Sequence, residues 1–188
     1  MPLHFAPNLS MLYTEVPFLD RFGQAAAAGF DAVEFLFPYE FGDKAIRQQL
    51  DGHSLRAVLF NINPGDLQKG ERGSLSHPHR RNLFRSSLQE ALDYASQLSV
   101  PRLHVMAGNR LPDLDPAAQF DCALENLLWA TPLAAACGVT LLLEPLNAID
   151  MPGYFISSTR EAMKLVTAAN LPNVKLQYDV YHSQMTEG

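Results

Sequence analysis

Two segments of the chain end in the same way: Val139-Thr140-Leu141-Leu142-Leu143-Glu144 and, 35 residues later, Val174-Lys175-Leu176-Gln177-Tyr178-Asp179. Each run is too short for a helix and lies between helical patterns, which is typical of a buried parallel strand. A charge at the C-terminal end of such a strand lies where α/β sheets and barrels bind their ligands. The two acids therefore predict half of a metal site.

Four further strand-like runs precede these two, and polar side chains recur at their ends. They are residues 3–8, 32–37, 55–62 and 102–106. Helical patterns with start and stop signals separate the runs. We expect helices after Pro17, at Asp43 as a likely N-cap, near Leu83, at Asp115-Pro116 with a kink at Pro132, and after the capping pair Ser158 and Glu161.

Alternating strands and helices with short connections predict a parallel sheet with right-handed crossovers. The six strand ends favour a (β/α)8 barrel over a doubly wound sheet, and no Gly-x-Gly-x-x-Gly motif follows the first run. A full barrel typically needs about 250 residues, whereas this chain reaches Gly188 just past the sixth strand. We therefore expect one domain over residues 1–188, a barrel truncated after about six strands that self-associates through its open edges.

Composition narrows the class of protein. The net charge is −6 and the basic residues are scattered, so no nucleic-acid surface is expected. No apolar stretch approaches the roughly 18 to 20 residues of a membrane helix, and the first residues do not resemble a signal peptide. These features predict a cytoplasmic protein without a membrane partner.

Cys122 and Cys137 fall in one predicted helix, about 22 Å apart at 1.5 Å per residue, and are expected to be free thiols.

Five motifs carry a resemblance to a known family. They are Phe5-Ala6-Pro7-Asn8-Leu9-Ser10-Met11, residues 30–39 (FDAVEFLFPY), residues 61–66 (NINPGD), residues 104–108 (HVMAG) and residues 143–147 (LEPLN). With these motifs in order, the whole chain closely resembles the hydroxypyruvate isomerases of the xylose-isomerase-like TIM barrels. The resemblance implies a metal-dependent isomerase that interconverts hydroxypyruvate and 2-hydroxy-3-oxopropanoate (tartronate semialdehyde) by carboxylate-mediated proton transfer.

The resemblance also implies roles for the two acids. Glu144 matches the family's glutamate that binds the metal and moves the proton, and Asp179 matches its second metal ligand. The family's ligand on strand seven and its second glutamate have no counterpart here, so we expect little isomerase activity from this chain alone. Oxygen ligands favour Mg²⁺ first, with Mn²⁺ as the alternative.

A small hydroxy-keto acid needs further contacts. His182 would lie above the site and hydrogen-bond a substrate oxygen, and the strand-end residues Glu34 and Asn61 either bind substrate or satisfy backbone groups at the barrel mouth. His104 either faces the site or packs inside the barrel. The loop from residue 64 to 78 is too long for a simple connector and is a candidate lid. It carries Lys69 and Arg72, which are candidates to bind the substrate carboxylate or are solvated loop charges.

Two other interpretations stay open. One is a related sugar isomerase or 3-epimerase, because the difference lies in substrate contacts. The other is a non-catalytic truncated remnant of a barrel. The zinc-dependent endonucleases of the same superfamily are disfavoured, because an acidic chain with six histidines lacks their basic surface and histidine cluster.

Overall fold

The computed structural model describes residues 3–188, and its centre is a parallel sheet of five strands in sequence order. The strands are β1 (Ala32–Glu34), β2 (Arg56–Asn61), β3 (Arg102–His104), β4 (Thr140–Leu143) and β5 (Val174–Leu176). Every neighbouring pair is parallel. The parallel, consecutive order is that of a TIM barrel and confirms the predicted fold class.

The first predicted strand is reduced to one bridge. Asn8 pairs in parallel with Glu34, and the backbone N–H of Glu34 donates to the Pro7 carbonyl at 3.0 Å. The segment therefore follows β1, as expected, without forming a regular strand. Pro7 explains part of this, because proline has no N–H to donate to a ladder.

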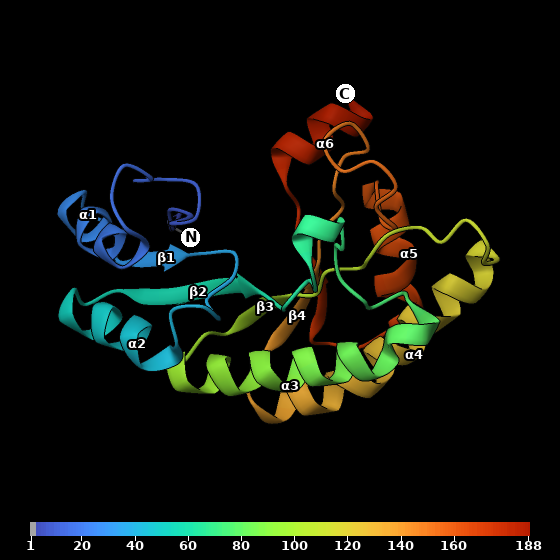
Figure 1. Cartoon of the computed structure of the whole chain (residues 1–188), viewed down its shortest axis with the longest axis horizontal. Helices are drawn as coiled ribbons and strands as arrows, with labels where there is room; N and C mark the ends of the chain where they lie inside the picture. The colour runs from blue at the N-terminus through green and yellow to red at the C-terminus, as the bar shows by residue number, and fades with distance from the viewer. Residues whose placement is uncertain (1–2) are drawn as a thin grey trace.

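Helices alternate with the strands. They are α1 (Arg21–Ala27), α2 (Asp43–Gly52), α3 (Arg81–Leu98), α4 (Pro116–Ala136), α5 (Thr159–Ala169) and α6 (Val180–Glu187), with short 3₁₀ turns η1 (Phe18–Asp20), η2 (Leu67–Lys69) and η3 (Pro78–Arg80). In Figure 1, α2, α3, α4 and α5 follow one another along one side of the curved sheet, and successive helices of this series are in contact. Among residues 3–188, no helix combines the length and the apolar character that crossing a membrane requires.

The helix boundaries confirm most of the predicted caps. Asp115 and Ser158 accept hydrogen bonds from the backbone N–H groups of Ala117 and Glu161, as N-caps do. Asp43 is instead the first helical residue after Gly42. Helix α6 was not predicted, because its sequence has no apolar stripe; Asp179 caps it by accepting from the His182 N–H at 2.8 Å.

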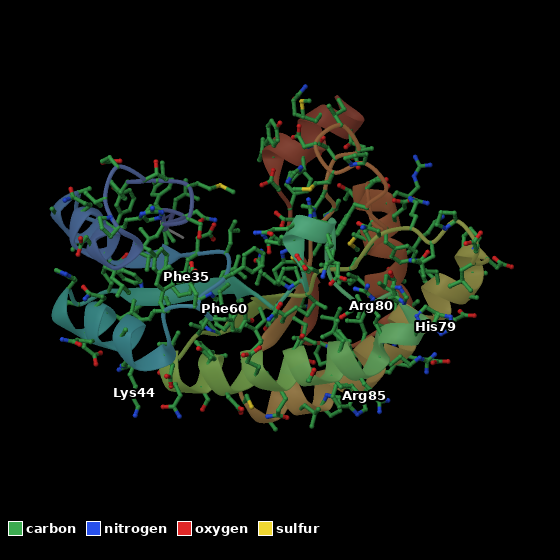
Figure 2. All side chains as sticks on the ribbon, viewed as in Figure 1. Phe35, Lys44, Phe60, His79, Arg80 and Arg85 are labelled. Atoms are coloured by element: carbon green, nitrogen blue, oxygen red, sulfur yellow. The ribbon has the colours of Figure 1, made fainter. Side chains whose placement is uncertain are left out.

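The core lies between the sheet and the helices. Phe35 and Phe60 are almost fully buried, and their rings stack with centroids 6.0 Å apart. Figure 2 shows both rings inside the molecule, whereas Lys44 and Arg85 extend outward from α2 and α3. Cys122 is buried and Cys137 is exposed, and both are free thiols as predicted.

Candidate active site

The C-terminal ends of the strands surround one cavity of about 450 Å³. Nine polar side chains line it, and apolar residues including Phe37, Met106 and Leu146 form the rest of its wall. The polar residues are Asn8, Glu34, Asn61, Arg72, His104, Glu144, Gln177, Asp179 and His182. The fold therefore brings seven of the eight predicted site residues to one pocket; Lys69 is the exception.

Glu144 and Asp179 come together at the ends of β4 and β5. One ligand atom from each, and one from His182, lie within 4.8 Å of one another, and all three residues are half-buried. Asp179 Oδ1 also accepts the hydrogen bond that caps α6, which is the turn-forming role that carboxylates often have at such positions. Its second oxygen, Oδ2, has no hydrogen bond within residues 3–188, so the capping role leaves Asp179 free to bind a ligand.

The Glu144 carboxyl group is strongly perturbed. Burial raises its pKa to about 8, and the neighbouring Asp179 carboxylate adds to the shift, while the Gln177 side chain opposes it. Burial also raises the pKa of Glu34, against the hydrogen bond that Asn8 donates to it at 3.1 Å. Three carboxyl groups thus face the same pocket, and a bound cation would offset the repulsion between their ionised forms.

His182 is held in one tautomer. The backbone N–H of Asn147 donates to His182 Nδ1 at 3.2 Å, so this nitrogen is an acceptor and the neutral ring carries its proton on Nε2. A ring nitrogen that carries a hydrogen has no free lone pair for a metal, so Nε2 of this tautomer cannot be a metal ligand. His182 is therefore better suited to donate a hydrogen bond from Nε2 than to be the third metal ligand.

His104 both packs in the barrel and faces the site. Its side chain is 1% exposed, and burial, followed by the nearby His182, lowers its pKa to about 3, so it is neutral. Its Nδ1 lies 3.4 Å from Glu144 Oε2, yet neither ring nitrogen has a well-formed hydrogen bond within residues 3–188. The two alternatives that the sequence left open are thus both true of this side chain.

The other predicted contacts differ in their surroundings. Asn61 is buried at the end of β2, where its backbone carbonyl accepts from the Tyr39 hydroxyl at 2.9 Å. Arg72 lines the cavity, whereas Lys69 is exposed and forms an ion pair with Asp66 at 3.0 Å. The different orientations of these two cations could not be read from the loop sequence.

The loop that carries Arg72 is attached to the rest of the site. Gly73 forms an antiparallel bridge with Ala107, and the Ser76 hydroxyl donates to the Ala107 carbonyl at 2.7 Å. A Cβ on Gly73 would lie 2.1 Å from the Met106 carbonyl oxygen, and its φ of +109° also favours glycine. These contacts join the segment to the loop that follows β3 and make it part of the pocket wall.

A divalent cation fits the Glu144 and Asp179 pair. Within residues 3–188, no lysine or arginine forms an ion pair with either carboxylate. Mg²⁺ typically takes one or two carboxylates and completes its shell with water and substrate oxygens, so two protein ligands suit it.

The sequence analysis did not single out Gln177, which lines the pocket beside Glu144. The available signal was a polar residue in an otherwise β-like run.

Comparisons with known proteins agree with this geometry. The family model described as "Xylose isomerase-like TIM barrel" matches residues 22–188, and the chain belongs to that family. Within it, the chain is a member of the hydroxypyruvate isomerase and 2-oxo-tetronate isomerase family.

Individual relatives show how far the similarity extends. The chain is 48% identical over 184 residues to the 2-oxo-tetronate isomerase of Cupriavidus necator strain H16, covering 98% of this chain and 71% of that protein. It is 37% identical over 186 residues to the hydroxypyruvate isomerase of Escherichia coli K12, covering 99% and 72%. A solved structure from Brucella melitensis, described as an AP endonuclease of family 2, has a TM-score of 0.96 and 47% identity, covering 100% of this chain and 72% of that one.

Proposed function

We propose that this chain forms the metal-binding part of an isomerase that moves a carbonyl group between adjacent carbons of a short 3-hydroxy-2-oxo acid. The observation that carries the proposal is the meeting of Glu144 and Asp179 in one pocket with the cationic Arg72. The carboxylates would hold Mg²⁺, or Mn²⁺ as the alternative, and Arg72 would bind the substrate carboxylate.

The reaction requires one proton to change carbons. For hydroxypyruvate, a base removes a proton from C3, and the C–H electron pair becomes the double bond of an enediolate. Return of a proton to C2, with transfer of the C3 hydroxyl proton to the oxygen on C2, gives 2-hydroxy-3-oxopropanoate. Glu144 is the proposed base, because its carboxyl group lies in the pocket beside Asp179, and a positioned carboxylate can remove such a proton. A bound divalent cation would stabilise the negative charge that develops on the oxygens.

The remaining pocket residues would orient the substrate. His182 would donate from Nε2 to a substrate oxygen, since Asn147 occupies its Nδ1. Glu34, Asn61 and His104 line the same cavity and are proposed to contact the substrate hydroxyl and carbonyl groups. A related sugar isomerase or epimerase would need the same proton transfer, but a neutral sugar would leave Arg72 without a carboxylate to bind.

Two substrates fit this class. Hydroxypyruvate follows from the motifs of the chain, and the four-carbon 2-oxo-tetronate is favoured by the 48% identity to a 2-oxo-tetronate isomerase. Rates of C3 proton exchange, measured for both acids at equal concentration, would rank them. An equal or greater rate with a neutral ketose would contradict the proposed substrate class.

The proposed base can be tested through half of the reaction. We would incubate the chain with Mn²⁺ and hydroxypyruvate in D₂O, quench samples with a chelator, and follow the C3 protons by ¹H NMR. Exchange with deuterium requires proton removal by one base only, so it does not depend on groups that complete turnover. We expect exchange with the wild type and a loss of roughly 10² or more in Glu144→Gln.

Glu125→Gln is the matched control, because Glu125 forms an ion pair with Arg81 on the outer helices and neither residue lines the pocket. This variant should exchange the C3 protons at the wild-type rate. Wild-type exchange in Glu144→Gln would remove Glu144 from the mechanism. Absence of exchange in the wild type, with Mn²⁺ bound, would favour the non-catalytic interpretation.

A further inference from the structure

Arg72 has one side of its guanidinium group committed to the protein. Its Nη1 donates to the backbone carbonyls of Glu71 at 2.8 Å and Leu67 at 3.2 Å. A guanidinium group has five N–H donors, so Nε and Nη2 still offer adjacent N–H groups. That edge is the one that binds a carboxylate through two parallel hydrogen bonds.

The surroundings leave this edge available. Among residues 3–188, no carboxylate forms an ion pair with Arg72, and it is the one arginine or lysine among the described residues that line the cavity. The same cavity holds the carboxyl groups of Glu34, Glu144 and Asp179. An anionic substrate would be repelled by these groups, so the position of the single guanidinium matters for its binding.

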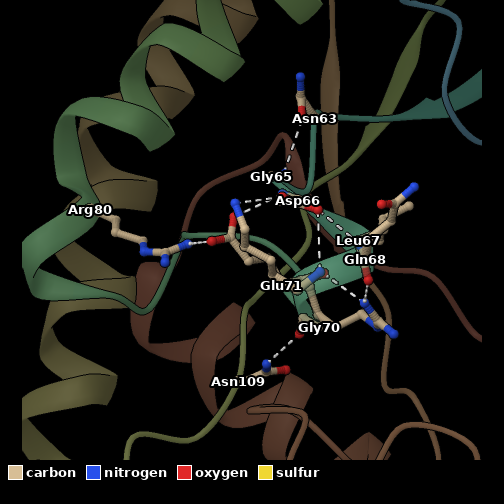
Figure 3. Close-up of polar contacts among 11 residues, drawn as sticks. Asn63, Gly65, Asp66, Leu67, Gln68, Gly70, Glu71, Arg80 and Asn109 are labelled. Carbon is tan, nitrogen blue, oxygen red and sulfur yellow. Dashed lines mark hydrogen bonds and ion pairs between the residues drawn. The ribbon is translucent and has the colours of Figure 1, made fainter.

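A polar network fixes the backbone that holds Arg72. Figure 3 shows Arg80 reaching from the start of α3 to the Glu71 carboxylate, with the two side chains 2.6 Å apart. The other Glu71 oxygen accepts from the Asp66 N–H at 2.8 Å. On the opposite side of the loop, Asn109 donates to the Gly70 carbonyl at 2.8 Å, as Figure 3 also shows.

A glycine in the loop leaves room for the Glu71 carboxylate. A Cβ on Gly65 would lie 2.1 Å from Glu71 Oε2, so the carboxylate fills space that only glycine leaves open. The Asp66 N–H and then Arg80 lower the pKa of Glu71, which is therefore ionised at neutral pH. Its backbone carbonyl is the closer of the two acceptors for Arg72 Nη1.

We propose that Glu71, anchored by Arg80, is a positioning residue that presents the Nε and Nη2 edge of Arg72 to the carboxylate of the substrate. The inference rests on the proposed function and adds to it the residues that select an acid over a neutral ketose. Glu71 acts through its backbone and its anchor, while Arg72 makes the contact.

The test compares two ligands that differ at one group. Dihydroxyacetone carries a hydroxymethyl group where hydroxypyruvate carries its carboxylate. We would titrate both into the Mn²⁺-loaded chain by calorimetry at neutral pH and take the ratio of their dissociation constants. We expect a wild-type preference for hydroxypyruvate of roughly tenfold to hundredfold, as for hydrogen bonds to a charged group. Arg72→Gln should remove most of it.

Glu71→Gln and Arg80→Met should each reduce the preference by roughly tenfold, with Mn²⁺ affinity unchanged. Arg80→Lys keeps a cation next to Glu71 and should restore part of the preference, and it remains informative if Glu71→Gln does not fold. Glu125→Gln breaks the Arg81–Glu125 ion pair, which has the same 2.6 Å length, and should leave the preference intact. A merely stabilising role for Glu71 would give Glu71→Gln and Glu125→Gln the same ligand preference.

The outcomes separate the two proposals. A wild-type preference that survives in both Glu71→Gln and Arg80→Met overturns the positioning role and leaves the isomerase proposal in place. A preference that survives Arg72→Gln shows that another group binds the carboxylate and overturns the inference at its base. If the wild type binds Mn²⁺ but shows no preference for the acid, the proposed substrate class fails together with the inference.

Discussion

Removing the hydroxyl group of Tyr154 should destabilise the wall of the pocket by a predictable amount. Tyr154 is 1% exposed, and its hydroxyl oxygen accepts from the backbone N–H of Ala107 at 2.8 Å. The carbonyl of the same Ala107 accepts from the backbone N–H of Ser76 at 3.0 Å and from its hydroxyl group at 2.7 Å. Ala107 thus links its own loop, which follows β3, to the loops that follow β2 and β4.

The substitution Tyr154→Phe keeps the ring, so no large cavity is created, and the main consequence is an unpaired buried N–H at Ala107. Leaving such a donor unsatisfied costs about 1 to 3 kcal/mol. For a chain of this size each kcal/mol corresponds to about 2 to 4 °C in Tm. We therefore expect the free energy of unfolding to fall by about 2 kcal/mol and Tm by about 4 to 8 °C.

Urea unfolding followed by circular dichroism would measure the change, with the denaturant slope checked for constancy. Tyr178→Phe is the matched control, because Tyr178 is 59% exposed and its hydroxyl contacts Ser183 at the surface. The control should stay within about 0.5 kcal/mol of the wild type. A Tyr154→Phe variant as stable as this control would refute the view that the Ala107 contact holds the loops together.

Three further predictions concern the site. Adding Mn²⁺ at about 100 times its Kd should raise the free energy of unfolding by about 2.7 kcal/mol, and EDTA should reverse this increase. The variant Asp179→Asn keeps a good N-cap for α6 and should abolish the increase. An undiminished increase in this variant would exclude Asp179 as a metal ligand. Because the folded protein lowers the pKa of Glu71 from its usual 4.5, its ionised carboxylate stabilises the fold at neutral pH, and this contribution should disappear as the pH falls below that value. Thermal melts of wild type and Glu71→Gln should therefore converge in acid, and a constant difference would contradict the assignment. Gly73→Ala should lower Tm and weaken hydroxypyruvate binding, because the new Cβ would collide with the Met106 backbone. Calorimetry would measure the binding. Unchanged binding would show that the bridge between Gly73 and Ala107 is not needed to bind the substrate.

The strand and helix pattern was readable from local chemistry. Apolar runs ending in polar residues located all five strands, and caps such as Asp115 and Ser158 located the helix starts, because these signals act within a few residues. The segment before Asn8 was less regular than expected, since Pro7 cannot donate to its neighbour. Helix α6 was missed because its sequence has no apolar stripe, and none of its residues is buried.

Part of the candidate site could also be predicted from the strand ends. Carboxyl ends of parallel strands meet at one edge of a sheet, so Glu144, Asp179 and Glu34 could be expected to meet once the strands were placed. The orientation of side chains in the long loop could not be expected. Lys69 and Arg72 are three residues apart, yet one pairs with Asp66 in solvent and the other lines the cavity.

Local sequence patterns were enough to predict the alternation of strands and helices and the polar residues at the strand ends, and five motifs carried the resemblance to a family of isomerases. The tertiary structure decided which groups share a pocket, that burial raises the pKa of Glu144 to about 8, and that Asn147 fixes the tautomer of His182. It also decided that Arg80 anchors Glu71 beside Arg72. These properties arise from desolvation and from contacts between segments distant in the chain, which no local pattern encodes.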